Sequence, residues 1–307
     1  MFSDQIKGSL RVAFAACIWG AAYPLTKLIL ADIPPISLGF MRFSLAAVFF
    51  MAITGSWPMS GVAKEDRPVF YRLAFWGVFM LILGMNFGLI WAPGIAASIL
   101  SGTPPLFTVI LAAIYLQEPM LLRHFISIGL ALAGLAMLSS DLDGGSIQIE
   151  PWKIAIGCLL TLIPQFSWAM YGITGKKLSE RYSWQSICRD TFAIGSAMLF
   201  FPAVIEVCIL GIGNWGKSSL LVLLYLAIMN SVVTYSLWNS ALKLIPVSTA
   251  SFLIYLQPVS GAILSFFLFG EKPGRVGILG IMAIFMALLL VMGRGRAKTN
   301  VLPKKAV

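Results

Sequence analysis

Long runs of apolar residues alternate with short polar stretches along almost the whole chain. A helix that crosses about 30 Å of hydrocarbon needs roughly 20 mostly apolar residues, because every backbone amide must be bonded within the helix. The runs that meet this requirement cover residues 10–30, 36–55, 70–91, 94–116, 123–140, 152–175, 185–207, 217–240, 247–269 and 275–293. The pattern therefore predicts an all-α integral membrane protein with ten transmembrane helices.

The second half of the chain repeats features of the first half at a nearly constant spacing. Pairs that lie 153 residues apart are Asn86 and Asn239, Pro105 and Pro258, and Glu118 and Glu271. Because each half holds an odd number of spans, the second copy must enter the membrane from the opposite side. We expect two inverted five-helix repeats around a central cavity. The expected parts are a first repeat at 1–140, a periplasmic linker at 141–151, a second repeat at 152–293 and a basic cytoplasmic tail at 294–307.

Composition and charge agree with a membrane protein. Hydrophobic residues make up 59% of the chain and charged ones 11%, against roughly 25% charged in soluble domains. With the N-terminus placed inside, most of the 22 Lys and Arg residues fall on the inner side, as cytoplasmic loops prefer. We expect a multi-pass protein of the bacterial inner membrane with both termini cytoplasmic. The net charge of +10 then reflects topology and the lipid bilayer rather than a nucleic-acid partner.

Polar and aromatic side chains recur near the middle of several predicted spans. A lone polar group costs several kcal/mol in hydrocarbon, so such residues usually face a partner or a water-filled cavity. Aromatic rings at the same depth could stack on a flat or cationic ligand, although helix packing explains them about as well. The candidate residues for binding a small-molecule substrate are Trp19, Tyr23, Asn86, Ser101, Gln165, Trp168, Tyr171, Tyr235, Trp238, Asn239, Tyr255 and Gln257.

Prolines and charges inside the spans suggest moving parts. Pro105 and Pro258 occupy equivalent places in the fourth and ninth segments, where a kink could act as a hinge, unless both are merely tolerated. Arg42 and Arg189 could attract a substrate carboxylate or gate access to it. They could equally snorkel and hold helix ends, which is the interpretation we favour from sequence.

Titratable groups are scarce. His124 is the only histidine, and the four cysteines form no CxxC pair, so neither a metal site, a cofactor nor a catalytic group is expected. Glu118 and Glu271 are expected to pair with basic residues at cytoplasmic helix ends. No acid lies deep in a predicted span, which favours a facilitator or exchanger over a proton-driven carrier.

Several of these features together resemble a known family. Trp19-Gly20, the paired Pro105 and Pro258, and the exits Glu118-Pro119 and Glu271-Lys272-Pro273 are similar to those of bacterial drug/metabolite transporters of the EamA type. The resemblance covers about residues 10–293 and implies ten helices in two copies. It also implies export of small metabolites, commonly amino acids, aromatic ones among them, or amphipathic drug-like compounds.

Three function classes remain to be compared. We rank a carrier that works by alternating access first, because inverted copies and matched prolines fit such a mechanism. A membrane channel or scaffold comes second, since polar and aromatic residues can also line a pore. An integral membrane enzyme comes last. The protein is expected to be a monomer or a homodimer.

Overall fold

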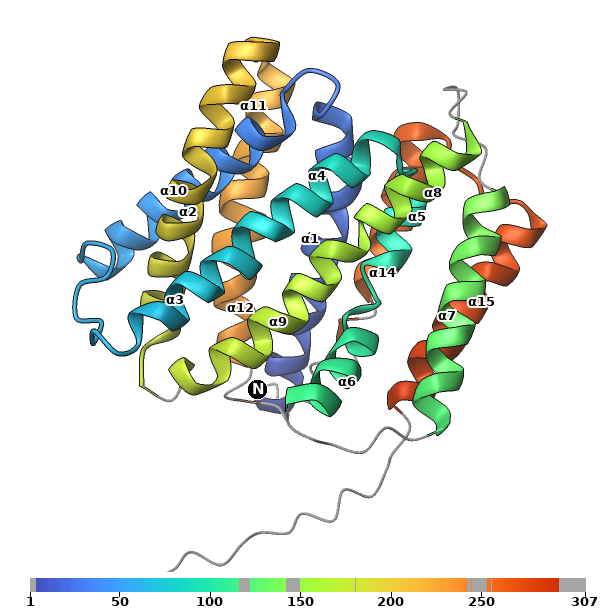
Figure 1. Ribbon diagram of the computed structural model, residues 1–307, viewed down its shortest axis with the longest axis horizontal. Helices are drawn as coiled ribbons and strands as arrows, with labels where there is room; N and C mark the ends of the chain where they lie inside the picture. Colours follow the sequence, from blue (N-terminus) through green and yellow to red (C-terminus); the bar gives the residue numbers. More distant parts are fainter. Residues whose placement is uncertain are drawn as a thin grey trace, which may run out of the picture.

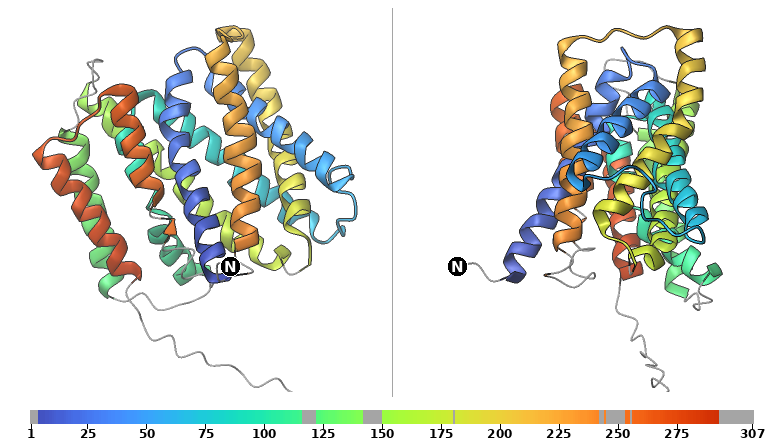
Figure 2. Two further views of the ribbon diagram at one scale, coloured as in Figure 1. Left: turned by 180° about the vertical axis from the view of Figure 1, so that it is seen from behind. Right: turned by 90° about the vertical axis from the view of Figure 1, so that its left-hand side faces the viewer.

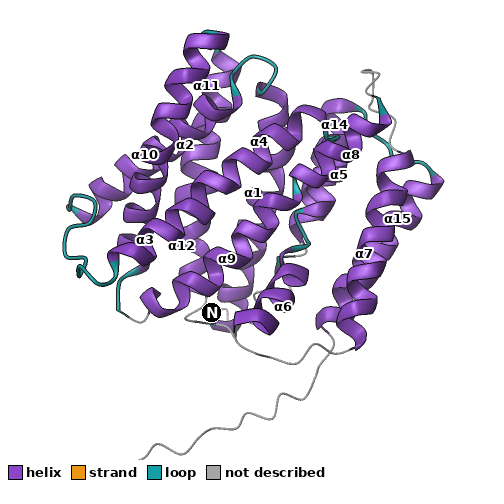
Figure 3. Ribbon diagram, viewed as in Figure 1, coloured by secondary structure: helices purple, strands orange, loops and turns teal. Residues whose placement is uncertain are grey.

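The computed structural model describes residues 4–115, 122–141, 150–179, 181–241, 244, 253–254 and 256–292. Within these ranges all the secondary-structure elements are helices and none is a strand (Figure 3). The helices of the first half are α1 Asp4–Ile29, α2 Pro35–Thr54, α3 Arg67–Ala74, η1 Phe75–Met80, α4 Leu81–Trp91, α5 Gly94–Leu100, α6 Pro104–Tyr115 and α7 Leu122–Asp141. Those of the second half are α8 Pro151–Leu160, α9 Leu162–Ser179, α10 Trp184–Leu210, α11 Lys217–Leu224, η2 Tyr225–Val233, α12 Thr234–Ala241, α14 Leu256–Phe269 and α15 Arg275–Met292. Figure 1 shows how they are arranged.

Six helical stretches of the described chain are long and apolar enough to cross a membrane. They are Asp4–Ile29, Pro35–Thr54, Arg67–Trp91, Pro151–Gly175, Trp184–Leu210 and Lys217–Ala241. Shorter helices occupy the other four predicted segments. The chain is therefore an all-helical, multi-pass membrane protein, and the total of ten spans stays a prediction.

Several spans are interrupted near their middle. The predicted fourth helix is two helices, α5 and α6, separated by residues 101–103. The predicted sixth helix is divided at Thr161, where Pro164 has no N–H to bond the carbonyl three to four residues earlier. The third and eighth spans each contain a π-helical segment, η1 and η2, a feature often found at functional sites. The side chains at the two breaks, Ser101, Thr103 and Thr161, are buried inside the molecule.

The expected hinge prolines lie at helix starts rather than within continuous helices. Pro105 is the second residue of α6, and Pro258 is the third described residue of α14. Proline is well tolerated in a first helical turn, because the N–H that it lacks has no partner there. The break at 101–103, and not a kink at Pro105, divides the fourth segment. A hinge role for either proline stays a prediction.

Helices α2 and α10 pack against each other in opposite directions. At one end, the carboxylate of Glu206 on α10 accepts hydrogen bonds from the backbone N–H groups of Ile36 and Ser37, which begin α2 (3.0 and 2.7 Å). At the other end, Asp190 accepts from the backbone N–H of Met59, which follows α2 (2.9 Å). Helix starts have unpaired N–H groups that attract anions, so Glu206 caps α2. These contacts join the two halves of the chain.

Helices α1, α5 and α14 meet closely beside this pair. Gly20 lies against Gln257 and Ser260, and Gly261 lies against Ser98, so a side-chain carbon at either glycine would collide with its neighbour. Small residues allow membrane helices to approach in this way. The contact brings the first turn of α14 beside the middle of α1.

Glu271 fixes the far ends of the same helices. Its buried carboxylate accepts from Lys27 Nζ (3.0 Å) and from the backbone N–H groups of Gly94 and Ile95 (2.9 and 2.7 Å). The expected pairing of Glu271 with a basic residue is correct, but the expected side is wrong. Lys27 ends α1, so the pair lies on the side opposite the N-terminus (Figure 2). In a ten-span protein every odd-numbered span ends on the side opposite the N-terminus, and Glu271 follows the ninth span. Glu118 lies outside the described residues.

Helices α7 and α15 form a pair at one edge of the molecule (Figures 1 and 2). Large apolar side chains are exposed on α7 and α15, among them Ile126 and Leu289, and also on α10, where Phe201 is 73% exposed. Soluble monomers rarely expose so much apolar surface to water, whereas contact with lipid tails carries no such cost. These faces fit a bilayer environment.

Candidate functional site

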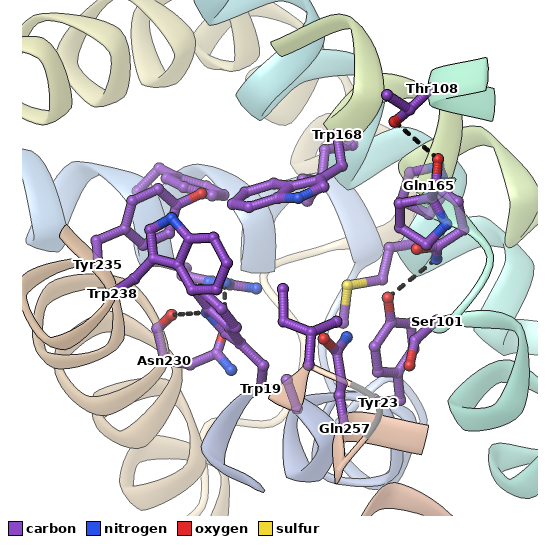
Figure 4. Close-up of a pocket in the computed structure, with 18 residues that line it drawn as sticks. Trp19, Tyr23, Ser101, Thr108, Gln165, Trp168, Asn230, Tyr235, Trp238 and Gln257 are labelled. Carbon is purple, nitrogen blue, oxygen red and sulfur yellow. Dashed lines mark hydrogen bonds between the residues drawn. The ribbon is translucent and has the colours of Figure 1, made fainter. Parts of the chain in front are cut away.

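The interrupted spans surround a cavity of about 380 Å³ between the two halves of the chain (Figure 4). This volume falls within the roughly 300–1,000 Å³ of small-molecule pockets. Eight of the candidate substrate-binding residues line it, namely Trp19, Tyr23, Ser101, Gln165, Trp168, Tyr235, Trp238 and Gln257, as does the gating candidate Arg42. The other lining residues are Ala22, Phe43, Leu81, Met85, Pro104, Thr108, Pro164, Asn230 and Ile254. The cavity is mostly apolar with a few polar groups.

Four aromatic side chains from three helices form one wall, which we call the aromatic wall: Trp19, Trp168, Tyr235 and Trp238. The Trp19 ring lies 5.8 Å from that of Trp168, 6.0 Å from Tyr235 and 5.8 Å from Trp238, in edge-on or tilted orientations. Such pairs stabilise one another, and all four residues line the cavity. Figure 4 shows this wall on one side of the cavity.

Polar side chains occupy the opposite side in the same view. Gln165 donates to the Tyr23 hydroxyl (3.0 Å) and to the carbonyl of Thr161 (3.1 Å). Ser101 lies in the break before α6 and donates to the Ser98 carbonyl (2.6 Å). The Gln257 amide has no side-chain hydrogen bond to a described residue. Of these polar groups, Ser101 comes from a helix break, whereas Tyr23 and Gln165 come from helices α1 and α9.

Arg42 reaches the cavity from α2. Its Nη2 donates to Asn230 Oδ1 (2.6 Å) and its Nε to Ser231 Oγ (3.2 Å), while the guanidinium lies 4.9 Å from the Phe43 ring. The side chain is 7% exposed, so it does not snorkel to an interface as we favoured from sequence. Asn230 Nδ2 in turn donates to the Ile18 carbonyl, and the backbone carbonyl of Asn230 accepts from Trp19 Nε1 (both 3.2 Å).

Arg189 has different surroundings. Its Nε and Nη2 donate to the two carboxylate oxygens of Asp190 (2.7 and 3.0 Å), and both residues are buried. It does not line the cavity. The sequence does not distinguish Arg189 from Arg42, but of the two only Arg42 lines the cavity.

Three other selected residues lie outside the cavity wall. Asn86 is buried and donates to the Pro35 carbonyl at the start of α2 (2.7 Å), and Asn239 donates to the Tyr235 carbonyl one turn earlier (2.7 Å). Tyr171 stacks behind Trp168, with ring centroids 5.7 Å apart. Their polar or aromatic groups serve packing and backbone contacts. Tyr255 lies outside the described residues.

Sequence reasoning missed Asn230. The signal was present, since an asparagine interrupts the apolar run Ala227-Ile228-Met229 of the eighth segment. The repeat pattern favours Asn239 as a site residue instead, because Asn239 has a repeat partner in Asn86. Asn230 has none, because the position 153 residues earlier is Gly77. Repeat matching therefore favoured symmetric residues over the one that contacts Arg42.

The described lining contains no Asp, Glu, His or Cys. Groups of three or more such residues that could hold a metal ion are likewise not found in the part of the chain that the structure describes. The chemistry that the cavity offers is stacking, amide and hydroxyl hydrogen bonding, and a single cation.

Apolar packing closes the cavity on the side away from the N-terminus. Tyr23, Met85 and Leu38 belong to a buried cluster that continues to Ile29 and Leu89 at the far ends of α1 and α4. The Lys27–Glu271 pair lies beside the same cluster, since Lys27 also bonds the carbonyl of Ala92.

Comparison with known proteins places the chain in a family. The model of the EamA-like transporter family matches residues 6–140 and 155–293. An uncharacterized transporter of Archaeoglobus fulgidus is 28% identical over 87% of this chain and 91% of its own. A probable amino-acid metabolite efflux pump of Escherichia coli is 26% identical (92% and 94%), and a probable terminal-alkyne amino-acid exporter of Streptantibioticus cattleyicolor 21% (87% and 89%).

A solved crystal structure supports the same fold. It is 16% identical, covers 92% of this chain and 95% of its own, and superposes with a TM-score of 0.59. The family and these relatives are transporters rather than enzymes. With two matched segments that together span most of its length, the chain belongs to the EamA-like transporter family.

Proposed function

We propose that this protein is an inner-membrane carrier that exports small metabolites, amino acids or flat amphipathic compounds, by alternating access. The observation that carries the proposal is the cavity between the two halves, with an aromatic wall on one side and polar groups on the other. Ligand pockets commonly combine an apolar lining with a few placed polar groups. The relatives named as amino-acid exporters agree with this substrate class.

The closure on one side supports alternating access rather than a continuous pore. The buried cluster around Ile29 and Leu89 separates the cavity from the face opposite the N-terminus. Opposed α2 and α10 fit two inverted repeats of five spans, which can rock about a central site. With the N-terminus cytoplasmic, the side closed here is the periplasmic one, so the cavity belongs to an inward-facing state.

Counterflow in proteoliposomes tests the carrier. Vesicles preloaded with an unlabelled amino acid are expected to accumulate the labelled form transiently above equilibrium, because exchange occurs at one alternating site. Trp19→Ala is expected to lower the initial rate at least tenfold by removing the centre of the aromatic wall. Trp152→Ala, at an exposed position outside the cavity, is the matched control and should transport normally. Labelled solute that equilibrates without overshoot would indicate a channel.

The orientation has its own test. In a cysteine-free background, Glu65→Cys lies in the loop after α2, and Ser218→Cys at the start of α11 lies on the opposite face. With cytoplasmic termini, a membrane-impermeant maleimide added to intact cells is expected to label position 218 and not position 65. The reverse labelling would contradict the proposed orientation.

A further inference from the structure

The cavity contains a cation that the protein does not neutralise. Arg42 is 7% exposed and lines the cavity, and its two hydrogen-bond partners, Asn230 and Ser231, are both neutral. No described Asp or Glu forms an ion pair with it. A buried charge normally has a partner of opposite sign, because isolation from water is costly. Arg42 therefore lacks the ion pair with an acidic group that a buried arginine normally forms.

The free part of the guanidinium is suited to a carboxylate. Nε and Nη2 each use one donor within the protein, and Nη1 donates to no described residue. A guanidinium has five N–H donors, so three remain, in a planar arrangement that matches the two oxygens of a carboxylate. The Asn230 and Ser231 contacts hold the head group in place and leave its other edge for a ligand.

Helix orientation adds to the same preference. Pro104 begins α6 and lines the cavity, and Gln257 lies in the first turn of α14, so both helices direct their N-terminal ends at this space. The N-terminal end of a helix carries a partial positive charge. The lining described has no acid to offset it. Arg42 is thus the one formally charged side chain in the described lining.

Building on the proposed transport function, we infer that the cavity selects substrates with a flat or aromatic apolar body and a net negative charge, and that Arg42 binds their carboxylate. The aromatic wall receives the ring. Amino acids fit less well than simple carboxylates, since their ammonium group would have no acidic partner in the described lining. The specificity therefore differs from that suggested by the names of the relatives.

Four ligands with one ring and nearly one length test the inference on purified full-length protein. They are 3-phenylpropanoate (anion), phenylalanine (zwitterion), 3-phenylpropanamide (neutral) and phenethylamine (cation). Calorimetric titration is expected to give the tightest binding for 3-phenylpropanoate, at least tenfold above the amide. Arg42→Gln should reduce the affinity for the anion to that for the amide and change the latter less than threefold. Arg42→Lys, which keeps the charge but loses the planar donors, should be intermediate.

A second variant keeps the arginine and neutralises its charge with a neighbouring carboxylate. Asn230→Asp places a carboxylate where the Oδ1 atom already lies 2.6 Å from Arg42, and so provides an internal partner. It is expected to abolish the preference for the anion as Arg42→Gln does, and it decides the matter if Arg42→Gln does not fold. Equal loss of affinity for all four ligands in both variants would indicate a structural role and overturn the inference.

Counterflow of the same ligands separates this inference from the transport function. Wild-type protein is expected to exchange 3-phenylpropanoate fastest. Exchange of phenylalanine or the amide at an equal or higher rate would keep the carrier and overturn the assignment of Arg42. If none of the four, nor any amino acid, shows counterflow while 3-phenylpropanoate still binds with the predicted dependence on Arg42, the binding site stands and the carrier proposal fails.

Discussion

Arg42 and Arg189 lie in corresponding helices of the two halves, α2 and α10, yet their surroundings are opposite. Arg189 is held by both oxygens of its neighbour Asp190, and the pair also fixes the loop at Met59. Arg42 has only neutral partners and contacts a cavity. A neutralised cation builds structure, whereas one left without an acid can bind a ligand. The comparison shows that arginines at corresponding positions of two repeats can differ in role, one holding the structure together and the other lining a cavity.

The largest effect is expected when the paired arginine loses its acid. Asp190→Ala should lower the free energy of unfolding by about 3–5 kcal/mol, because Arg189, 2% exposed, would remain buried without a counter-charge. Denaturant unfolding in mixed micelles measures the change. The double variant Arg189→Met with Asp190→Asn removes both charges and keeps an acceptor for Met59, so it should be far milder. A stability within about 1 kcal/mol of wild type for Asp190→Ala would mean that the two arginines do not differ as described.

Glu271 extends the comparison to a third buried charge. Glu271→Gln leaves Lys27, whose side chain is 14% exposed, without its acid and weakens the cap on α5. The loss should be about 1.5–3 kcal/mol, the value of hydrogen bonds to charged groups, and smaller than for Asp190→Ala because Lys27 is less deeply buried. Arg275→Gln, exposed at the start of α15, is the control. Equal stability of the two variants would show that the Glu271 contacts contribute little.

The smallest effect concerns the neutral amides. Asn86→Ala removes the donor to the Pro35 carbonyl and should cost roughly 1 kcal/mol of stability without changing the affinity for 3-phenylpropanoate more than twofold. Asn239→Ala, half-buried and bonded within its own helix, should cost less. Thermal unfolding with and without ligand distinguishes the two effects. A large loss of affinity in Asn86→Ala would return this residue to the binding site.

The main features of the fold follow from local pattern. Apolar runs of spanning length predicted where the helical stretches of the described chain lie, since the bilayer requires that length and that composition, but not the breaks at 101–103 and Thr161. Polar and aromatic residues near mid-span predicted eight residues of the cavity, because hydrocarbon tolerates such groups only beside partners or water. Family membership, too, was visible in motifs such as Trp19-Gly20 and Glu271-Lys272-Pro273.

The tertiary structure decided what those polar groups contact. Sequence spacing could not tell that Asn86 bonds the start of α2, that Asp190 neutralises Arg189, or that Asn230 and not Asn239 meets Arg42. A helix places side chains on all its sides, and which side faces a cavity depends on the packing of helices far apart in the chain. Depth in the membrane is a property of one segment, whereas the partner of a buried charge is a property of the whole assembly.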